Sequence, residues 1–136
     1  MRIVLDTNAL ISTLSEKLNY EIVLDCLLLE KYDLFITNEI LLEYEEKVEF
    51  FFDKQVLENT LELLKLLSNI HKIATYYQLN LITSDSSDNK FVDCAFACNA
   101  DYIVTDDKHF NILKTIDFPK LKTISIEQFA KLLKEK

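Results

Sequence analysis

Carboxylates placed directly after short apolar runs are the residues of this sequence best suited to chemistry. Asp6 follows Ile3-Val4-Leu5, and Asp106 and Asp107 follow Ile103-Val104-Thr105. Apolar runs of this length are typical of buried strands, and ligands of parallel sheets bind beyond the carboxyl ends of the strands. Because a carboxylate at such a place is costly to bury without a partner, Asp6 above all indicates a functional position.

Further acids lie in segments that can reach the same edge of a sheet. Asp85 and Asp88 stand in a polar loop before a predicted helix, and Glu43 lies on the helix that follows the second predicted strand. Packed carboxylates repel and raise one another's pKa unless a cation lies among them. Since Mg²⁺ and Mn²⁺ prefer oxygen ligands, convergence of these acids predicts a site for one or two such ions.

Each of these acids also has an ordinary structural explanation. Asp88 and Asp85 fit an N-cap and a turn residue, and Glu43 fits a solvated helix face shared with Glu39 and Glu46. Taken singly, these explanations are the better ones. Only the convergence of the acids on one pocket favours the metal site.

The elements that must position these acids alternate between strands and helices. Apolar patterning predicts strands over residues 3–5, 33–37, 101–105 and 121–124, and a brief extended segment over 79–82. It predicts helices over 9–18, 21–31, 38–48 with Asn38 as the N-cap, 55–67, 69–75, 89–99 and 126–134. We therefore expect an α/β fold, a three-layer sandwich with a mainly parallel central sheet of about four to five strands and the strand over 3–5 at its centre.

Length and composition exclude several functional classes. The 136 residues fit one domain over residues 1–136, and they include no glycine and one proline, Pro119. A P-loop, a dinucleotide fingerprint and the nucleophile elbow of α/β-hydrolases all need glycines at close approaches or sharp turns. ATP-driven, NAD-dependent and hydrolase chemistry by those routes is excluded.

Charge is distributed unevenly along the chain. The net charge is −8, yet residues 1–107 hold 8 basic and 20 acidic residues, whereas residues 108–136 hold 7 basic and 3 acidic ones. A negative net charge disfavours general coating of nucleic acid or of an anionic membrane. The basic C-terminal part is either a solvated lysine-rich helix or a flank that contacts phosphates, for which the candidates are Lys108, Lys114, Lys120 and Lys122.

The cysteine and histidine positions indicate ordinary structural roles. Cys26, Cys94 and Cys98 lie in apolar helical patterns without a paired C-x-x-C motif, as expected of reduced core thiols in the cytoplasm. His71 and His109 stand in polar surroundings and are expected at the surface rather than as ligands. The N-terminal residues reach an acid after three apolar positions, so neither a signal peptide nor a membrane span is expected.

Four segments carry a pattern that extends over nearly the whole chain. They are Ile3-Val4-Leu5-Asp6-Thr7-Asn8, Ile40-Leu41-Leu42-Glu43-Tyr44, Asp85-Ser86-Ser87-Asp88-Asn89-Lys90-Phe91 leading into Ala95, and Ala100-Asp101-Tyr102-Ile103-Val104-Thr105-Asp106-Asp107. In this order and with this spacing they resemble the PIN domain family, in particular its VapC-like members, described as toxins of bacterial and archaeal toxin–antitoxin pairs.

The resemblance implies which residues form the site. The acids that would hold one or two Mg²⁺ or Mn²⁺ ions are Asp6, Glu43, Asp88 and Asp107. Thr105 would give polar support, and Asn8 would either orient an acid or cap a helix. The family often has proline and glycine where this chain has Ser86, Asn99 and Asp106, which blurs the register of the third and fourth acids. Asp93 is therefore the second candidate for the third acid, and Asp106 for the fourth.

The resemblance also implies an activity and partners. PIN nucleases hydrolyse phosphodiester bonds of single-stranded RNA and leave a 5′ phosphate and a 3′ hydroxyl, and an antitoxin protein would hold the enzyme inactive. A homodimer is also implied, and the aromatic run Phe50-Phe51-Phe52 offers either a partner surface or packing between helices. Two alternatives stay open: a catalytically degenerate PIN module that acts as a protein-interaction scaffold, and an aspartate-based phosphotransfer domain.

Overall fold

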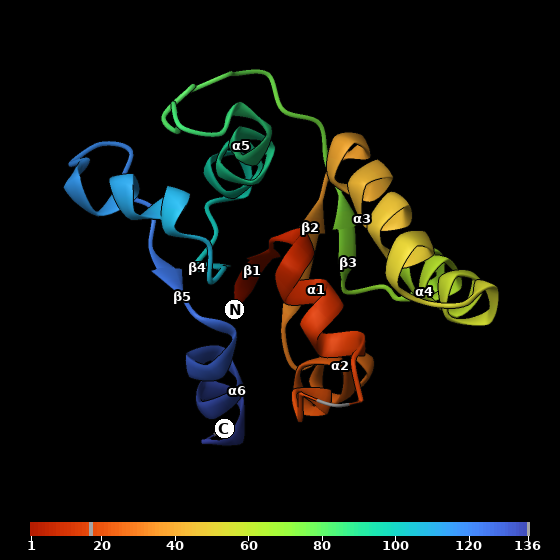
Figure 1. Cartoon of the computed structure of the whole chain (residues 1–136). Helices are drawn as coiled ribbons and strands as arrows, with labels where there is room; N and C mark the ends of the chain where they lie inside the picture. The colour runs from red at the N-terminus through yellow and green to blue at the C-terminus, as the bar shows by residue number, and fades with distance from the viewer. Residues whose placement is uncertain (17, 136) are drawn as a thin grey trace.

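The chain folds around a parallel β-sheet. The computed structural model describes residues 1–16 and 18–135, and within these residues the sheet has five strands. They are β1 (Arg2–Leu5), β2 (Asp33–Ile36), β3 (Ile70–Lys72), β4 (Tyr102–Val104) and β5 (Thr123–Ile124). Their order is β3-β2-β1-β4-β5, and every neighbouring pair is parallel (Figure 1). The predicted α/β fold and its central strand are confirmed.

β1 lies at the centre because its side chains suit burial on both faces. Ile3, Val4 and Leu5 are each at most 1% exposed. Near-continuous apolar runs of this kind are typical of parallel strands that helices cover on both sides. The residue that follows the strand, Asp6, therefore stands at a buried edge of the sheet.

Helices cover both faces of this sheet. They are α1 (Thr7–Leu14), α2 (Glu21–Leu28), α3 (Asn38–Phe51), α4 (Lys54–Leu66), α5 (Asn89–Cys98) and α6 (Ile126–Lys134), with 3₁₀ segments η1 (Ser86–Asp88) and η2 (Lys108–Thr115). The chain runs from β1 through β2 to β3 in one direction and returns to β4 in the other, so right-handed crossovers place α1 to α4 on one face and α5 on the opposite face. In Figure 1, α5 lies above the strands it contacts, whereas α1 and α2 lie below.

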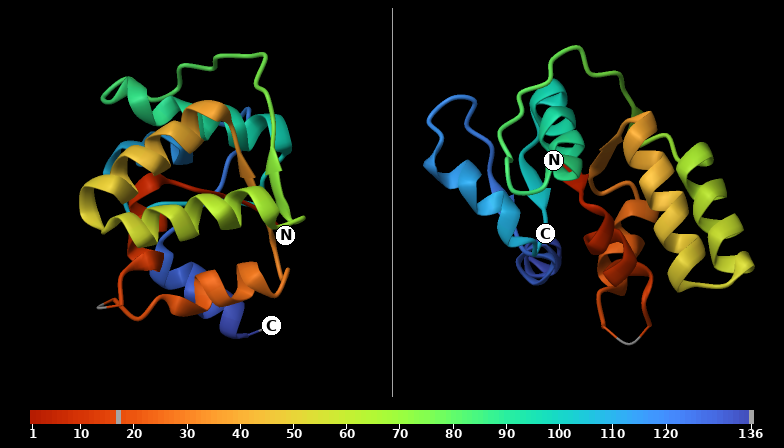
Figure 2. Two further views of the ribbon diagram at one scale, coloured as in Figure 1. Left: turned by 90° about the vertical axis from the view of Figure 1, so that its right-hand side faces the viewer. Right: turned by 45° about the horizontal axis from the view of Figure 1, so that its top comes forward.

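The two edges of the sheet, formed by β3 and β5, are covered differently. α3 and α4 lie side by side beyond the β3 end, and η2 lies at the opposite end, beside β5 (Figure 2). Between them, residues 73–85 arch over α5 (green in Figures 1 and 2). The acids predicted to form a site thus come from segments on both sides of β1.

The helix predicted over residues 69–75 is wrong, because residues 70–72 form the edge strand β3. Ile70, His71 and Lys72 pair with Leu34, Phe35 and Ile36 of β2. Local patterning missed this strand because its formation depends on the free edge that β2 offers, and β2 is distant in sequence.

The extended segment predicted over residues 79–82 joins no strand of the described sheet. Its backbone is instead bound to a side chain of α5. The amide N–H of Ile82 donates to Asn89 Oδ1 at 2.9 Å, and its carbonyl accepts from Asn89 Nδ2 at 2.8 Å. Asn89 thereby fixes the loop that precedes its own helix.

Several helix ends also differ from prediction. Thr37, rather than Asn38, caps α3, because its hydroxyl accepts from the Ile40 N–H at 3.2 Å. The same helix runs on to Phe51, so Phe50 and Phe51 lie on its last turn, 78% and 57% exposed. The predicted helices over 9–18 and 21–31 end at Leu14 and Leu28, residue 17 lies outside the described residues, and η2 was not predicted.

The three cysteines are free and buried, as expected of core thiols. Across residues 1–16 and 18–135, no helix combines the length and apolar character needed to span a membrane.

Candidate active site

Five acids line one cavity of about 260 Å³, and four of them, all except Asp85, come from four separate segments that the resemblance singles out. Asp6 follows β1, Glu43 lies on α3, Asp88 ends η1, and Asp107 follows β4. These are the four positions that the resemblance implies. Their convergence follows from the topology, because β1 and β4 are neighbours and their carboxyl ends meet at one edge of the sheet.

Asp6 is the most buried of the four acids, with 4% of its surface exposed. It is the N-cap of α1, since Oδ1 accepts from the Ala9 N–H at 2.8 Å, and Oδ2 accepts from the Thr105 hydroxyl. The pKa of Asp6 is raised to about 6, chiefly by burial and also by the charges of Asp88 and Asp107. The two hydrogen bonds lower this pKa but do not offset the effect of burial. A bound cation would offset the free-energy cost of burying the ionised carboxylate.

Thr105 connects two of the acids. Its hydroxyl donates to Asp6 Oδ2 and accepts from the Asp107 N–H at 3.0 Å. Asp107 in turn caps η2, because its Oδ1 accepts from the His109 N–H at 2.9 Å. Asp106 does not line this cavity, and its Oδ1 accepts from the Ile126 N–H at 3.4 Å instead.

Asp88 faces His109, a residue expected at the surface. The His109 Nδ1 atom lies 3.3 Å from Asp88 Oδ2, 3.2 Å from Asp107 Oδ1 and 3.8 Å from Asp85 Oδ2. The side chain is 41% exposed, so the surface position is correct, but its ring nitrogen stands among three carboxylates. Burial, together with the charges of Asp107 and Asp85, raises the pKa of Asp88 to about 6.

Asp93, the second candidate for the third acid, lies elsewhere. It is buried on α5, its Oδ1 accepts from the Leu79 N–H at 3.0 Å, and it lines a different cavity. Asp85 serves as the predicted turn residue, accepting from the Ser87 N–H at 3.1 Å. Asp88 stands at the N-cap position of α5 but makes no capping bond there.

A match to a family model covers most of the chain. The model is that of the PIN domain, and it matches residues 2–109. This chain belongs to the PIN domain family.

Solved structures share the fold of this PIN domain. One is VapBC2 from Rickettsia felis bound to a DNA fragment from their promoter, with a TM-score of 0.63, 20% identity and coverage of 92% of this chain and 98% of the other. Another is PAE2754 from Pyrobaculum aerophilum, with a TM-score of 0.64, 14% identity and coverage of 100% and 97%. A third is the PIN domain endonuclease Utp24, with a TM-score of 0.53, 18% identity and coverage of 91% and 84%. No curated protein sequence matches the chain.

Glu43 of this PIN domain is held from two sides. Its Oε1 lies 2.9 Å from the Lys90 ammonium, and its Oε2 accepts from the Thr7 hydroxyl. Its helix is placed by the next residue, Tyr44, which is fully buried and donates to the Leu5 carbonyl at 2.5 Å. Glu43 is therefore not part of a solvated face.

Three residues of the site went unrecognised in the sequence. Thr7, Lys90 and His109 contact the acids, yet none of them was predicted to do so. The signal for Lys90 is its place two residues after Asp88, on the first turn of α5. No local signal marks His109, because η2 determines its position.

Asn8 lines the cavity from the exposed side of the first turn of α1. The alternative that it caps a helix is wrong, because Asp6 caps α1.

The four lysines proposed as phosphate contacts are exposed on the side of the molecule that holds η2 and β5. Lys108 and Lys114 line a cavity of about 220 Å³ together with Asp107. Lys114, Lys120 and Lys122 line a neighbouring cavity of about 320 Å³. The basic flank therefore begins at the acidic site and extends away from it.

Proposed function

We propose that this PIN domain, as a single domain over residues 1–136, is a Mg²⁺- or Mn²⁺-dependent endoribonuclease that cuts single-stranded RNA. The observation that carries the proposal is the convergence of Asp6, Glu43, Asp88 and Asp107 on one cavity. A PIN domain endonuclease among the solved structures of the same fold agrees with it. The family match gives no support to the phosphotransfer alternative.

The donor set of the cavity suits a divalent cation with oxygen ligands. Two of its acids, Asp6 and Asp88, have a raised pKa, chiefly because of burial and in part because of the charges of neighbouring carboxylates. Carboxylates from several segments, with room for waters, fit Mg²⁺ or Mn²⁺. The group formed by Asp85, Asp88 and His109, whose ligand atoms lie within 4.8 Å of one another, offers a second set of donors beside them.

When bound, such an ion would lower the pKa of a water and stabilise the charge that develops on the phosphate. The hydrolysis forms a bond between the water oxygen and phosphorus and breaks the bond from phosphorus to the 3′ oxygen, which takes a proton. Asp6 and Asp107, joined through Thr105, fix the position of the ligand oxygens. Lys90 and Thr7 orient Glu43, and Lys108, Lys114, Lys120 and Lys122 would contact the RNA backbone.

We further propose that the chain is the toxin of a toxin–antitoxin pair and works in the cytoplasm. The VapBC2 structure shares its fold, and three free cysteines suit a reducing compartment. Phe50 and Phe51, exposed at the end of α3, offer an apolar surface for an antitoxin or for a second copy of the chain.

The deciding experiment is cleavage of a single-stranded RNA by the purified protein with Mg²⁺ or Mn²⁺. EDTA and the variant Asp6→Asn should each abolish cutting. Asparagine is a good N-cap, so the variant keeps α1 capped while it removes the charge and the second oxygen, which accepts from the Thr105 hydroxyl. Product ends should be a 5′ phosphate and a 3′ hydroxyl.

Absence of cutting by the wild type would contradict the proposal, and calorimetric titration with Mn²⁺ would then distinguish its causes. Binding without cutting would indicate a narrow RNA substrate outside the set tested. No binding would favour the degenerate scaffold.

A further inference from the structure

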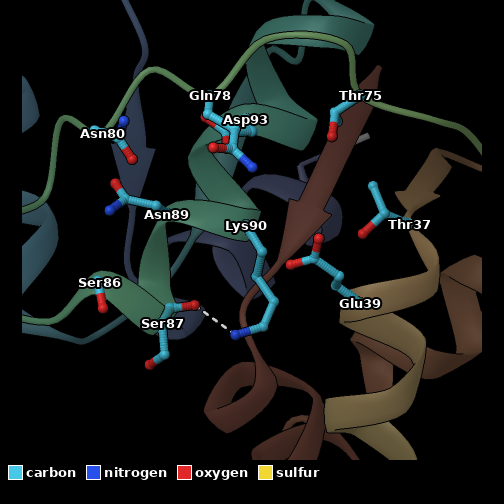
Figure 3. Close-up of a pocket in the computed structure, with 10 residues that line it drawn as sticks. All are labelled: Thr37, Glu39, Thr75, Gln78, Asn80, Ser86, Ser87, Asn89, Lys90 and Asp93. Carbon is cyan, nitrogen blue, oxygen red and sulfur yellow. Dashed lines mark hydrogen bonds between the residues drawn. The ribbon is translucent and has the colours of Figure 1, made fainter.

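A second cavity, of about 190 Å³, lies beside the acidic site. The arch over residues 73–85, the first turns of α5 and the start of α3 enclose it, and the ten residues that line it are all polar or charged (Figure 3). Half of these residues, Glu39, Gln78, Asn80, Ser86 and Ser87, are exposed, so the cavity opens to solvent and offers polar groups to whatever binds there. The cavity therefore suits a polar ligand.

Asp93 is the buried charged residue of this cavity, and its hydrogen bonds indicate which kind of ligand would fit. It is 8% exposed and its Oδ1 accepts from the Leu79 N–H at 3.0 Å, which ties the arch to α5. Among residues 1–16 and 18–135, no donor is bonded to its other oxygen, although the residue lines the cavity. Burial and the nearby charge of Glu39 raise the pKa of Asp93. A ligand that donates hydrogen bonds would satisfy this carboxylate.

The cavity is continuous with the acidic site. Ser87 lines both cavities. Lys90 also lines the second cavity, while its ammonium lies 2.9 Å from Glu43 Oε1 in the first. In Figure 3, Lys90 runs from the second cavity toward Ser87, and Glu39 extends from α3 toward the same space. A nucleotide whose phosphate is held by a cation at the four acids can therefore place its base here.

The charges of the cavity select among the parts of an RNA. Two carboxylates, Asp93 and Glu39, repel phosphate and accept hydrogen bonds. Guanine is the base with two adjacent N–H donors, N1–H and N2–H₂, on one edge, and a carboxylate accepts both. Lys90 and the amides of Gln78 and Asn80 offer donors for its O6 atom.

The arch also provides aromatic surface. Tyr76 and Tyr77 are 89% and 70% exposed, although both are large side chains. Exposed aromatic rings beside a groove stack bases of single-stranded nucleic acid. Neither ring lines the cavity, and that of Tyr77 packs edge-on against Phe96 of α5, so only Tyr76 is offered to a base beyond the cavity.

We propose that this cavity binds a guanine base of single-stranded RNA next to the scissile phosphate, and that Asp93 reads its N1–H and N2–H₂ groups. The inference rests on the proposed ribonuclease function and adds its base preference. It makes Asp93, discarded as a metal ligand, a specificity residue of the same enzyme.

The test compares two short RNAs, each a run of uridines with one guanosine or one inosine at the same position. Inosine lacks only the N2 amino group. For the wild type, kcat/KM should be roughly tenfold higher on the guanosine RNA, the usual size for one base contact. In Asp93→Asn this ratio should fall to about one, because the amide no longer accepts from both donors.

Three variants serve the comparison. Asp93→Asn keeps an oxygen for the Leu79 N–H, so the arch should stay in place. Cutting of the guanosine RNA should fall more in this variant than cutting of the inosine RNA, because inosine loses only its N1–H contact. Glu39→Gln, on the exposed wall, should lower the ratio too and replaces Asp93→Asn if that variant does not fold. Asp25→Asn, an exposed acid on α2, controls for loss of one charge and should leave the ratio unchanged.

The outcomes separate the two proposals. If the wild type cuts both RNAs equally, or prefers another base, or keeps its guanosine preference in Asp93→Asn, the guanine inference is overturned and the ribonuclease stands. If the wild type binds Mn²⁺ but cuts neither RNA, the guanine inference is overturned; if it binds no Mn²⁺ either, the proposed function fails with it.

Discussion

A single hydroxyl, that of Thr105, joins two of the four acids. It donates to Asp6 and accepts from the backbone of Asp107, so the ends of β1 and β4 are held in one arrangement before any ion binds. Groups that orient metal ligands in this way affect metal affinity almost as strongly as the ligands do. The site should therefore be sensitive to residues that carry no charge.

Thr105→Val tests this sensitivity. The buried valine keeps the shape but leaves Asp6 Oδ2 and the Asp107 N–H without their shared partner. We expect Mn²⁺ affinity to fall by about 10- to 100-fold in calorimetric titration. Thr115→Val, which removes an exposed hydroxyl bonded to the Ile112 carbonyl, should change nothing. Equal affinity of Thr105→Val and wild type would show that Thr105 does not position the acids.

The neighbouring acids Asp106 and Asp107 form a matched pair for a second test. Only Asp107 lines the acidic cavity, whereas Asp106 accepts from the Ile126 N–H, a bond that asparagine can also accept. We expect kcat/KM on RNA to fall roughly 100-fold or more in Asp107→Asn and to change about twofold or less in Asp106→Asn. The reverse order would mean that the fourth acid is Asp106.

At the scale of elements, the placement of α3 depends on one buried contact. Tyr44 is fully buried and its hydroxyl donates to the Leu5 carbonyl at 2.5 Å, the carbonyl that precedes Asp6. Because Glu43 is the adjacent residue, the same contact determines how far this acid lies from β1.

Tyr44→Phe should lower the free energy of unfolding by about 1–3 kcal/mol, since a buried carbonyl loses its donor. Urea denaturation followed by circular dichroism measures this change. Tyr76→Phe, which alters an 89% exposed side chain, serves as the control and should unfold as the wild type does. A Tyr44→Phe variant as stable as this control would contradict the anchoring role.

The elements and the site residues could be predicted from the sequence where local patterns mark them. Apolar runs identified β1, β2 and β4, because burial selects apolar side chains, and the carboxylates that follow β1 and β4 singled out Asp6 and the pair Asp106 and Asp107. The preference for Asp107 over Asp106 came from the resemblance to the family. β3 was mistaken for a helix because its partner β2 lies far away in sequence. His109 was missed because η2, the segment that carries it to Asp88, was not predicted.

For the whole molecule, the acidic site should lower the free energy of unfolding by an amount that depends on pH. Asp6 has its pKa raised from 3.8 to about 6 by burial, so the folded chain binds more protons than the unfolded chain between these values. The stabilising contribution of protonated Asp6 is complete below 3.8 and is lost as pH rises through about 6. Without metal, the contribution of Asp6 should make the protein less stable at neutral pH than in mild acid.

Chemical denaturation in EDTA measures this effect. Relative to Asp6→Asn, which does not titrate at this position, the wild type should lose about 1 kcal/mol of stability between about pH 5 and about pH 7.5. The comparison removes the contributions of other acids. Parallel pH profiles for the two proteins would mean that Asp6 has an ordinary pKa.

The strand order β3-β2-β1-β4-β5 also governs when activity can appear during synthesis. β1 leaves the ribosome first, yet its partner β4, with Thr105 and Asp107 behind it, is among the last elements made. A nascent chain that stops after α5 has Asp6, Glu43 and Asp88 but neither the fourth acid nor the hydroxyl that orients the first. Such incomplete products should be inert toward RNA, including the messenger being translated, and an inhibitor has nothing to restrain until the C-terminal part of the chain has emerged.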